Sequence, residues 1–298
     1  MPGRRWLREI ERLDPIADHK RIVYIDGVHE FPWDIQRALE LALFRTFAVP
    51  SIGGLLAGTG EFFKRPQKRY DDTDLLISLL LEEGYDTGRG ARALERMNAI
   101  HGRFKISNDD YLYVLSTFVL EPIRWIDRYG WRRSVPAERL AMHEFWRNIG
   151  GRMGIRDIPA SLEAMDAFNR QFEADNFQAN DNSRRVGEAT RDFLLTWFPR
   201  PLRGAVTRGI YAALDPDVAD AFDFPRATSL ERAVLQGALR LRARVHRWLP
   251  GRGAPRLRTE PGPRPSYKDG WRLDLLGPPS FVAAQARDSQ TEGEQEPS

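Results

Sequence analysis

The sequence contains no cysteine among its 298 residues. This absence excludes disulfide bonds, thiolate metal sites, iron–sulfur clusters and a cysteine nucleophile. Any metal would have to be held by histidine, by carboxylate or by another nitrogen or oxygen donor.

Long apolar runs are also absent. No segment reaches the roughly 18 uninterrupted apolar residues that a membrane-spanning helix needs, so we expect none. The N-terminus, MPGRRWLREIERLDP, lacks the apolar stretch of a signal peptide. We therefore expect a cytoplasmic protein, with membrane association left open. Nothing in the sequence indicates an oligomeric state.

Several catalytic motifs are missing. There is no glycine-rich dinucleotide or P-loop motif, no Gly-x-Ser-x-Gly elbow and no His-Glu-x-x-His. No Glu-x-x-His occurs, which argues against a carboxylate-bridged di-iron site. These absences exclude the commonest nucleotide, hydrolase and metalloprotease chemistries.

The two signs of charge are nearly balanced, with 45 basic and 42 acidic residues. The basic run at 64–69 is followed at once by Asp71, Asp72 and Asp74. A nucleic-acid footprint should be of one sign, so we expect no nucleic-acid partner.

Helical patterns dominate the chain and predict an all-α fold with a single large domain. The one strand-like run is Arg21–Ile25, followed by an Asp26-Gly27 turn signal. We expect an N-terminal segment at 1–50 packed on the core, a helical domain at 51–250, and at 251–298 a Pro/Gly/Arg-rich arm and disordered tail. Apolar periodicity and capping residues predict helices at 31–47, 72–83, 90–104, 110–129, 136–153, 160–177, 183–198, 202–214 and 229–249. Ser107–Asp110 supplies an N-cap signal for the helix at 110–129, and Pro136 lies near the first turn of the helix at 136–153.

Among the five histidines, His101 stands out by its position. It lies at the edge of the apolar face of the predicted helix Gly90–Phe104, next to Ile100. A buried imidazole needs a partner, and a metal is one such partner. From spacing alone the commoner explanation is a core histidine bonded to a carbonyl or carboxylate.

Arg69, Asp72 and Thr73 form a second candidate group. Arg69 and Thr73 are four residues apart and would share a helix face. Arginine could bind an anionic group or polarise a ligand, and Asp72 could act as a general base. Composition alone equally fits a solvated, capped helix start beside an exposed basic run.

The segment Ser229–Leu249 predicts a basic amphipathic helix, in which arginines alternate with leucine and valine. Such a helix can lie on an anionic membrane surface. More often it is a surface helix whose arginines snorkel. Peripheral membrane contact through 229–249 is therefore a hypothesis.

The order of several short motifs resembles the catalytic-domain family of latex-clearing proteins (rubber oxygenases) and the oxygenase MpaB, more closely on the MpaB side. The resemblance covers the stretch from about Gly53 to Pro159. The motifs are GTGEF at 58–62, KRYDDT at 68–73, ERMNAIH at 95–101, ISNDDYLYVL at 106–115 and YGWR at 129–132.

The resemblance implies a globin-like helical core with haem b, in which His101 is the proximal iron ligand and Arg69 and Thr73 line the haem pocket. It further implies an oxygenase that acts with dioxygen on an apolar, alkene-containing small molecule. Rubber-cleaving relatives carry a lysine just before the threonine, where this chain has Asp72. This departure argues against polyisoprene as the substrate. A haem-free protein that binds lipid or isoprenoid, and a membrane-peripheral interaction protein, are the alternatives.

Overall fold

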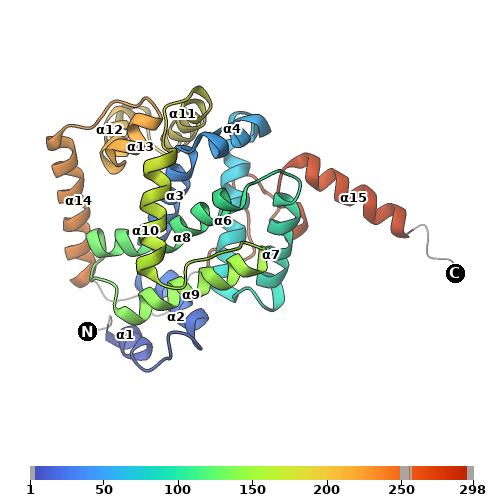
Figure 1. The fold of residues 1–298 in the computed structure, drawn as a ribbon, viewed down its shortest axis with the longest axis horizontal. Helices are drawn as coiled ribbons and strands as arrows, with labels where there is room; N and C mark the ends of the chain where they lie inside the picture. The colour runs from blue at the N-terminus through green and yellow to red at the C-terminus, as the bar shows by residue number, and fades with distance from the viewer. Residues whose placement is uncertain (1–3, 249–254, 256, 294–298) are drawn as a thin grey trace. The chain divides into compact units, whose positions relative to one another are not determined.

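The computed structural model describes residues 4–248, 255 and 257–293. These residues contain fifteen α-helices and no β-strand, which confirms the all-α prediction (Figure 1). The described residues divide into two compact units, one of residues 4–63, 106–248 and 255 and one of residues 64–105 and 257–293. The predicted segments at 1–50, 51–250 and 251–298 and the globin-like core stay predictions.

The first unit is built around helices α3 and α8. Its helices are α1 (Arg4–Ile10), α2 (His19–Ile25), α3 (Pro32–Phe47), α4 (Pro50–Thr59), α8 (Asn108–Tyr129), α9 (Pro136–Arg152), α10 (Leu162–Asn176), α11 (Asp181–Leu195), α12 (Arg203–Ala213), α13 (Pro216–Ala221) and α14 (Ser229–Trp248). The short α5 (Glu61–Lys64) spans the change from one unit to the next along the chain.

Aromatic side chains fill much of the first unit's core. Phe44 of α3 meets Phe222 edge to face at a ring-centroid distance of 5.5 Å, and Phe47 meets Phe62 in the same way at 5.1 Å. Edge-to-face pairs are a favoured aromatic geometry and add to the stabilisation from buried area. The helices of this unit are therefore held mainly by apolar packing.

The strand predicted at Arg21–Ile25 is wrong. These residues form α2, which continues through a π-helical turn at Asp26–Glu30. Ile22, Val23 and Ile25 are buried and α2 packs against α9. Their β-branched side chains suit a strand, but burial against a neighbouring helix overrides that propensity.

Helix starts are set by caps and prolines. The Ser107 side chain accepts a hydrogen bond from the Asp110 backbone N–H at 3.0 Å, which confirms the predicted cap of α8. Pro136 occupies the first turn of α9, also as predicted. Pro122 lies inside α8 without ending it.

The second unit contains α6 (Pro66–Glu83), α7 (Gly88–His101), a 3-10 turn at Leu273–Leu275 and α15 (Pro279–Gly293). The α6–α7 connection is tight, because a Cβ atom at Gly90 would collide with the Gly84 carbonyl oxygen. Residues 257–278, which we call the C-terminal arm, pack on α6 and α7. Their shared apolar cluster joins Leu75, Leu76, Leu79 and Ala93 to Tyr267 and Leu276.

Two boundaries in this unit differ from prediction. The helix expected to begin at Asp72 begins at Pro66, so Asp72 lies inside it and does not cap it. The helix expected to end at Phe104 ends at His101. Residues 287–293, expected in a disordered tail, are helical, and 294–298 lie outside the described residues.

In the part of the chain that the structure describes, no helix by itself combines the length and the apolar composition of a membrane span. Helices α3 and α4 together meet those criteria, but they are bent by 98° at the break between them.

Candidate functional site

All four predicted site residues lie in the second unit. Arg69, Asp72 and Thr73 are on the first half of α6, and His101 is the last residue of α7. The two helices pack against each other. The structure therefore brings the sequence-predicted residues into one pair of helices.

Arg69 and Thr73 contact one another across one helical turn, as their spacing predicts. The Thr73 hydroxyl donates to the Arg69 carbonyl oxygen at 2.9 Å, and the Arg69 guanidinium donates to the same hydroxyl. Both side chains are half-buried. This arrangement fixes the arginine along the helix and keeps its charge close to the α6 surface.

His101 is partly buried, and burial lowers the pKa of its imidazole to about 4. The positive charge of Arg69 contributes further to this lowering of the pKa. Because the charge of Arg69 affects the pKa of His101, the two side chains are close enough to interact electrostatically. At neutral pH the imidazole is uncharged, which is the form that binds metal ions.

Asp72 is 5% exposed, and its carboxylate anchors the C-terminal arm. Lys68 Nζ donates to the two oxygens at 2.8 and 3.0 Å. The Tyr267 hydroxyl also donates to this carboxylate, and the Gly277 backbone N–H does so at 3.0 Å. These contacts are those of a structural anchor, and a role for Asp72 in proton transfer stays a prediction.

Gly277 is suited to this contact by its backbone. Its φ of +117° lies in the region that favours glycine, and an added Cβ would come within 2.9 Å of the Ile100 side chain. The arm therefore approaches the residue next to His101 as closely as a glycine permits.

Sequence analysis assigned no role in this site to Lys68, Arg96 or Tyr267. Lys68 Nζ donates to Tyr267 and to the carbonyl of Gly277 at 2.8 and 2.9 Å. Arg96, which is 8% exposed, donates to the carbonyls of Leu276 and Asp274 at 2.5 and 2.6 Å. The sequence did offer one signal for Arg96. It is a charged residue that lies next to Met97 and three residues after Ala93, on the predicted apolar face of its helix.

The donor chemistry of this unit fits a cofactor that needs one protein ligand. The described residues contain no group of three or more His, Cys, Asp or Glu that could hold a metal ion. Haem brings four nitrogen ligands of its own and takes an imidazole as its proximal ligand. A neutral His101 near the cationic Arg69 suits such a group, since the arginine could pair with a propionate.

Comparison with known proteins gives the family. Residues 36–248 match the family described as ER-bound oxygenase mpaB/B'/Rubber oxygenase, catalytic domain. The chain belongs to this family. The matched residues include both helices of the candidate site, and the resemblance inferred from the motifs is confirmed.

Two curated relatives support the same family assignment. The chain is 30% identical over 189 residues to "ER-bound oxygenase mpaB" of Penicillium roqueforti, which is 57% of this chain and 63% of the relative. It is 30% identical over 191 residues to "ER-bound oxygenase mpaB'" of Penicillium brevicompactum, which is 58% of this chain and 45% of the relative. The chain thus spans less than two thirds of these relatives. The C-terminal arm lies beyond the family match.

Proposed function

We propose that this protein is a haem-dependent oxygenase that uses dioxygen on an apolar, alkene-containing small molecule, with His101 as the iron ligand. The observation that carries the proposal is the position of His101 at the end of α7, where its imidazole is partly buried and where burial and the charge of Arg69 lower its pKa. Membership of an oxygenase catalytic-domain family supports it. The substrate class rests on the family resemblance.

Each residue would have a separate task. When bound, haem would supply the redox chemistry with dioxygen that no side chain of this chain can supply. His101 would hold the group through its neutral imidazole. Arg69 would bind a propionate or donate a hydrogen bond to the reacting molecule, and Thr73 would fix the direction of the guanidinium. Asp72 would hold the arm against α6.

An absorption spectrum tests the proposal. The full chain, expressed with a haem precursor, should show a Soret band that shifts with dithionite and carbon monoxide. The His101→Ala variant should purify with little haem, whereas His246→Ala, an exposed histidine on α14, should retain it. A colourless parent protein that is folded and binds an apolar ligand would instead favour the haem-free binding protein. Full haem occupancy in His101→Ala would assign the ligand elsewhere.

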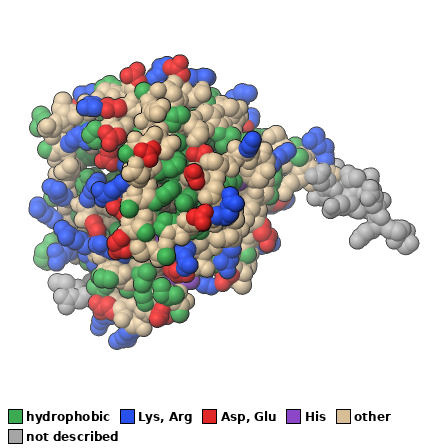
Figure 2. All heavy atoms as spheres, viewed as in Figure 1, with side chains coloured by type: hydrophobic (Ala, Val, Ile, Leu, Met, Phe, Trp, Pro, Cys, Tyr) green, Lys and Arg blue, Asp and Glu red, His purple; other side chains and the backbone are tan. Residues whose placement is uncertain are grey.

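A second proposal concerns peripheral contact with an anionic membrane through 229–249, of which Leu249 lies outside the described residues. Five large apolar side chains on one side of α14 are 51% to 81% exposed: Leu230, Val234, Leu241, Val245 and Trp248. Arg240, Arg244 and Arg247 follow one edge of this stripe at helical spacing. Basic and apolar side chains gather at the left edge of Figure 2, where α14 lies in Figure 1.

This combination is typical of helices that lie in a membrane interface. The relatives are named as ER-bound, which is compatible with membrane association. Co-sedimentation with phosphatidylserine vesicles should be lost in Leu241→Ser/Val245→Ser. It should be kept in Ile16→Ser, which changes an apolar side chain that is 48% exposed outside α14. Equal sedimentation of both variants would contradict the proposal.

A further inference from the structure

Helices α6 and α7 form a hairpin, and the candidate site lies at its open end. The short connection 84–87 joins the two helices, which pack against each other. Consecutive helices that are joined and packed in this way run antiparallel. Arg69 lies near the start of α6, and His101 is the last residue of α7. At about 1.5 Å of rise per residue, both lie about 20 Å from the connection along the helix axes.

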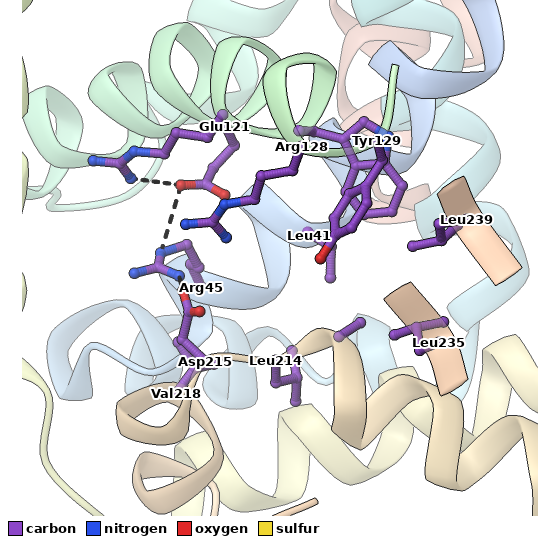
Figure 3. A pocket seen from close by; sticks show the side chains of 13 residues that line it. Leu41, Arg45, Glu121, Arg128, Tyr129, Leu214, Asp215, Val218, Leu235 and Leu239 are labelled. Carbon is purple, nitrogen blue, oxygen red and sulfur yellow. Dashed lines mark hydrogen bonds and ion pairs between the residues drawn. The ribbon is translucent and has the colours of Figure 1, made fainter. Parts of the chain in front are cut away.

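The connected end of the hairpin is tied directly. Arg89, near the start of α7, pairs with Glu83, the last residue of α6. Arg45 of α3 and Glu121 of α8 form the same kind of direct tie between neighbouring helices, at 3.8 Å (Figure 3). Because the helices are long, a change of about 5° in the angle between them would still move their open ends by about 2 Å. A functional site must hold its groups within about 0.5 Å, so the open end needs ties of its own.

Residues 275–277 of the C-terminal arm bind α6 near this open end. The Gly277 backbone N–H donates to the Asp72 carboxylate at 3.0 Å. The Lys68 ammonium group donates to the carbonyl oxygens of Gly277 and Leu275 at 2.9 and 3.2 Å. All three hydrogen bonds involve a charged group, and such bonds are about twice as strong as those between neutral groups.

The same three residues also bind α7. The Leu276 carbonyl oxygen accepts from the Arg96 guanidinium at 2.5 Å. Gly277 lies against Ile100, because an added Cβ atom would come within 2.9 Å of the Ile100 side chain. Consecutive backbone groups of one short segment are therefore held by both helices of the hairpin. We call residues 275–277 the staple.

We propose that the staple positions the candidate site. By joining α6 to α7 at the open end of the hairpin, it fixes the place of His101 relative to Arg69. Lys68, Asp72 and Arg96 are then positioning residues, which act through the two helices. The inference rests on the proposed function, since the relative placement of His101 and Arg69 has a consequence only if they bind haem. The arm lies beyond the family match, so membership of the family does not predict this device.

Distances between two spin labels test the staple without haem. The chain contains no cysteine, so two introduced cysteines are its only attachment sites. Lys64→Cys/Ala99→Cys spans the open end, and Glu83→Cys/Glu95→Cys spans the hairpin nearer to its connection. All four positions are exposed. Pulsed electron paramagnetic resonance should give a narrow distance distribution for both pairs in the otherwise unchanged chain.

Two variants remove the staple from opposite sides. Gly277→Ala should broaden the distribution at the open end only, because the added methyl group meets Ile100 and the φ of +117° disfavours alanine. The matched control is Gly262→Ala, which adds the same group to the arm where no described residue beyond its neighbours lies within 4 Å. Arg96→Gln should have the same effect as Gly277→Ala, and its control is Arg92→Gln, at an exposed arginine of α7. Circular dichroism of each variant establishes that it is folded.

The rate of haem loss tests the consequence for the site. Transfer of haem from the loaded full chain to an excess of apomyoglobin should be faster by about tenfold or more in Gly277→Ala and Arg96→Gln, because residues that orient a metal ligand commonly change metal affinity by this amount. Gly262→Ala and Arg92→Gln should lose haem at the rate of the parent.

Three outcomes would overturn the proposal. The first is an open-end distribution that neither Gly277→Ala nor Arg96→Gln broadens. The second is equal broadening of both label pairs, which would mean that the arm supports the hairpin as a whole. The third is a broadened open end with haem loss at the parent rate, which would mean that the site does not depend on the staple. A parent chain that binds no haem would contradict the proposed function instead, and the label distances alone would then decide whether the staple holds the open end.

Discussion

Each unit contains a buried ionic network, and the central residues of the two networks have opposite charges. In the first unit a cation, Arg45 of α3, is surrounded by Glu121, Glu173 and Asp215. In the second unit an anion, Asp72 of α6, is surrounded by donors from Lys68, Tyr267 and Gly277. The partners of Arg45 come largely from other helices, whereas those of Asp72 come largely from the arm, which contains no α-helix.

The difference follows from the apolar core available to each unit. The first unit has a large aromatic cluster, and its network connects helices that already pack together. The second unit has two long helices whose apolar cluster is completed only by the arm. Buried polar groups of the second unit therefore hold a segment in place, while those of the first unit tie packed helices together.

The largest expected effect comes from removing the cation of the first network. Arg45→Met leaves the buried carboxylate of Glu173 without its arginine, and removal of one partner from a buried ionic pair costs about 3–5 kcal/mol. We expect a loss of this size in the urea unfolding free energy at pH 7. The control is Arg170→Met, since Arg170 is 73% exposed and its ion pair with Asp166 should contribute less than about 1 kcal/mol. If both variants lose the same amount of unfolding free energy, the Arg45 network stabilises the fold no more than an exposed ion pair does.

A second network of the first unit gives the pH dependence. Arg132 pairs with both Glu30 and Glu138, and Asp26 lies beside them with a pKa raised well above its ordinary value, mainly by burial and then by the charge of Glu138. Asp26 is thus favoured in its protonated form. A raised pKa in the folded state contributes stability at low pH that is lost as the pH rises through the folded pKa.

Asp26→Asn should remove this loss, because an amide stays neutral and can still donate to Glu138. Between the ordinary pKa of an aspartate and the raised pKa of Asp26 in the folded protein, the parent should lose about 1.4 kcal/mol per pH unit relative to the variant. Above the raised pKa the difference should stay constant, so unfolding free energies measured from about pH 5 upward should diverge and then run parallel. For Asp181→Asn, at a carboxylate that is 86% exposed, the unfolding free energy should depend on pH as it does in the parent. If the pH dependence of Asp26→Asn also equals that of the parent, the proton is held by another group.

Local patterns were enough to predict most of the helices. Ser107 and Pro136 marked helix starts, and the spacing of Arg69 and Thr73 predicted their contact. The run Arg21–Ile25 failed, because the choice between strand and helix was made by burial against α9, which no local pattern records.

The candidate site was predictable only in its local part. His101 was found because it lies at the edge of an apolar helix face, and its low pKa agrees with burial. The partners of Asp72 could not be found in this way, since Tyr267 lies 195 residues further along the chain. Such a contact is set by the fold and leaves no periodicity in the sequence.

The smallest expected effect comes from the arm itself. Tyr267→Phe removes the hydroxyl that donates to Asp72 but leaves Lys68 and Gly277 bonded to that carboxylate. We expect a loss of about 1 kcal/mol, the usual contribution of one hydrogen bond. Hydrogen exchange at residues 257–278 should become faster, while exchange in α3 stays unchanged.

The control for this variant is Tyr24→Phe, at a half-buried tyrosine in α2 of the first unit, which should leave exchange in the arm unchanged. Faster exchange confined to the arm would show that a single hydroxyl controls how firmly this segment is held against α6. Faster exchange spread equally over α3 and the arm would contradict the comparison, because it would make the two networks parts of one cooperative structure. Unchanged exchange in the arm would mean that Lys68, Arg96 and the apolar cluster hold it without the Tyr267 hydroxyl.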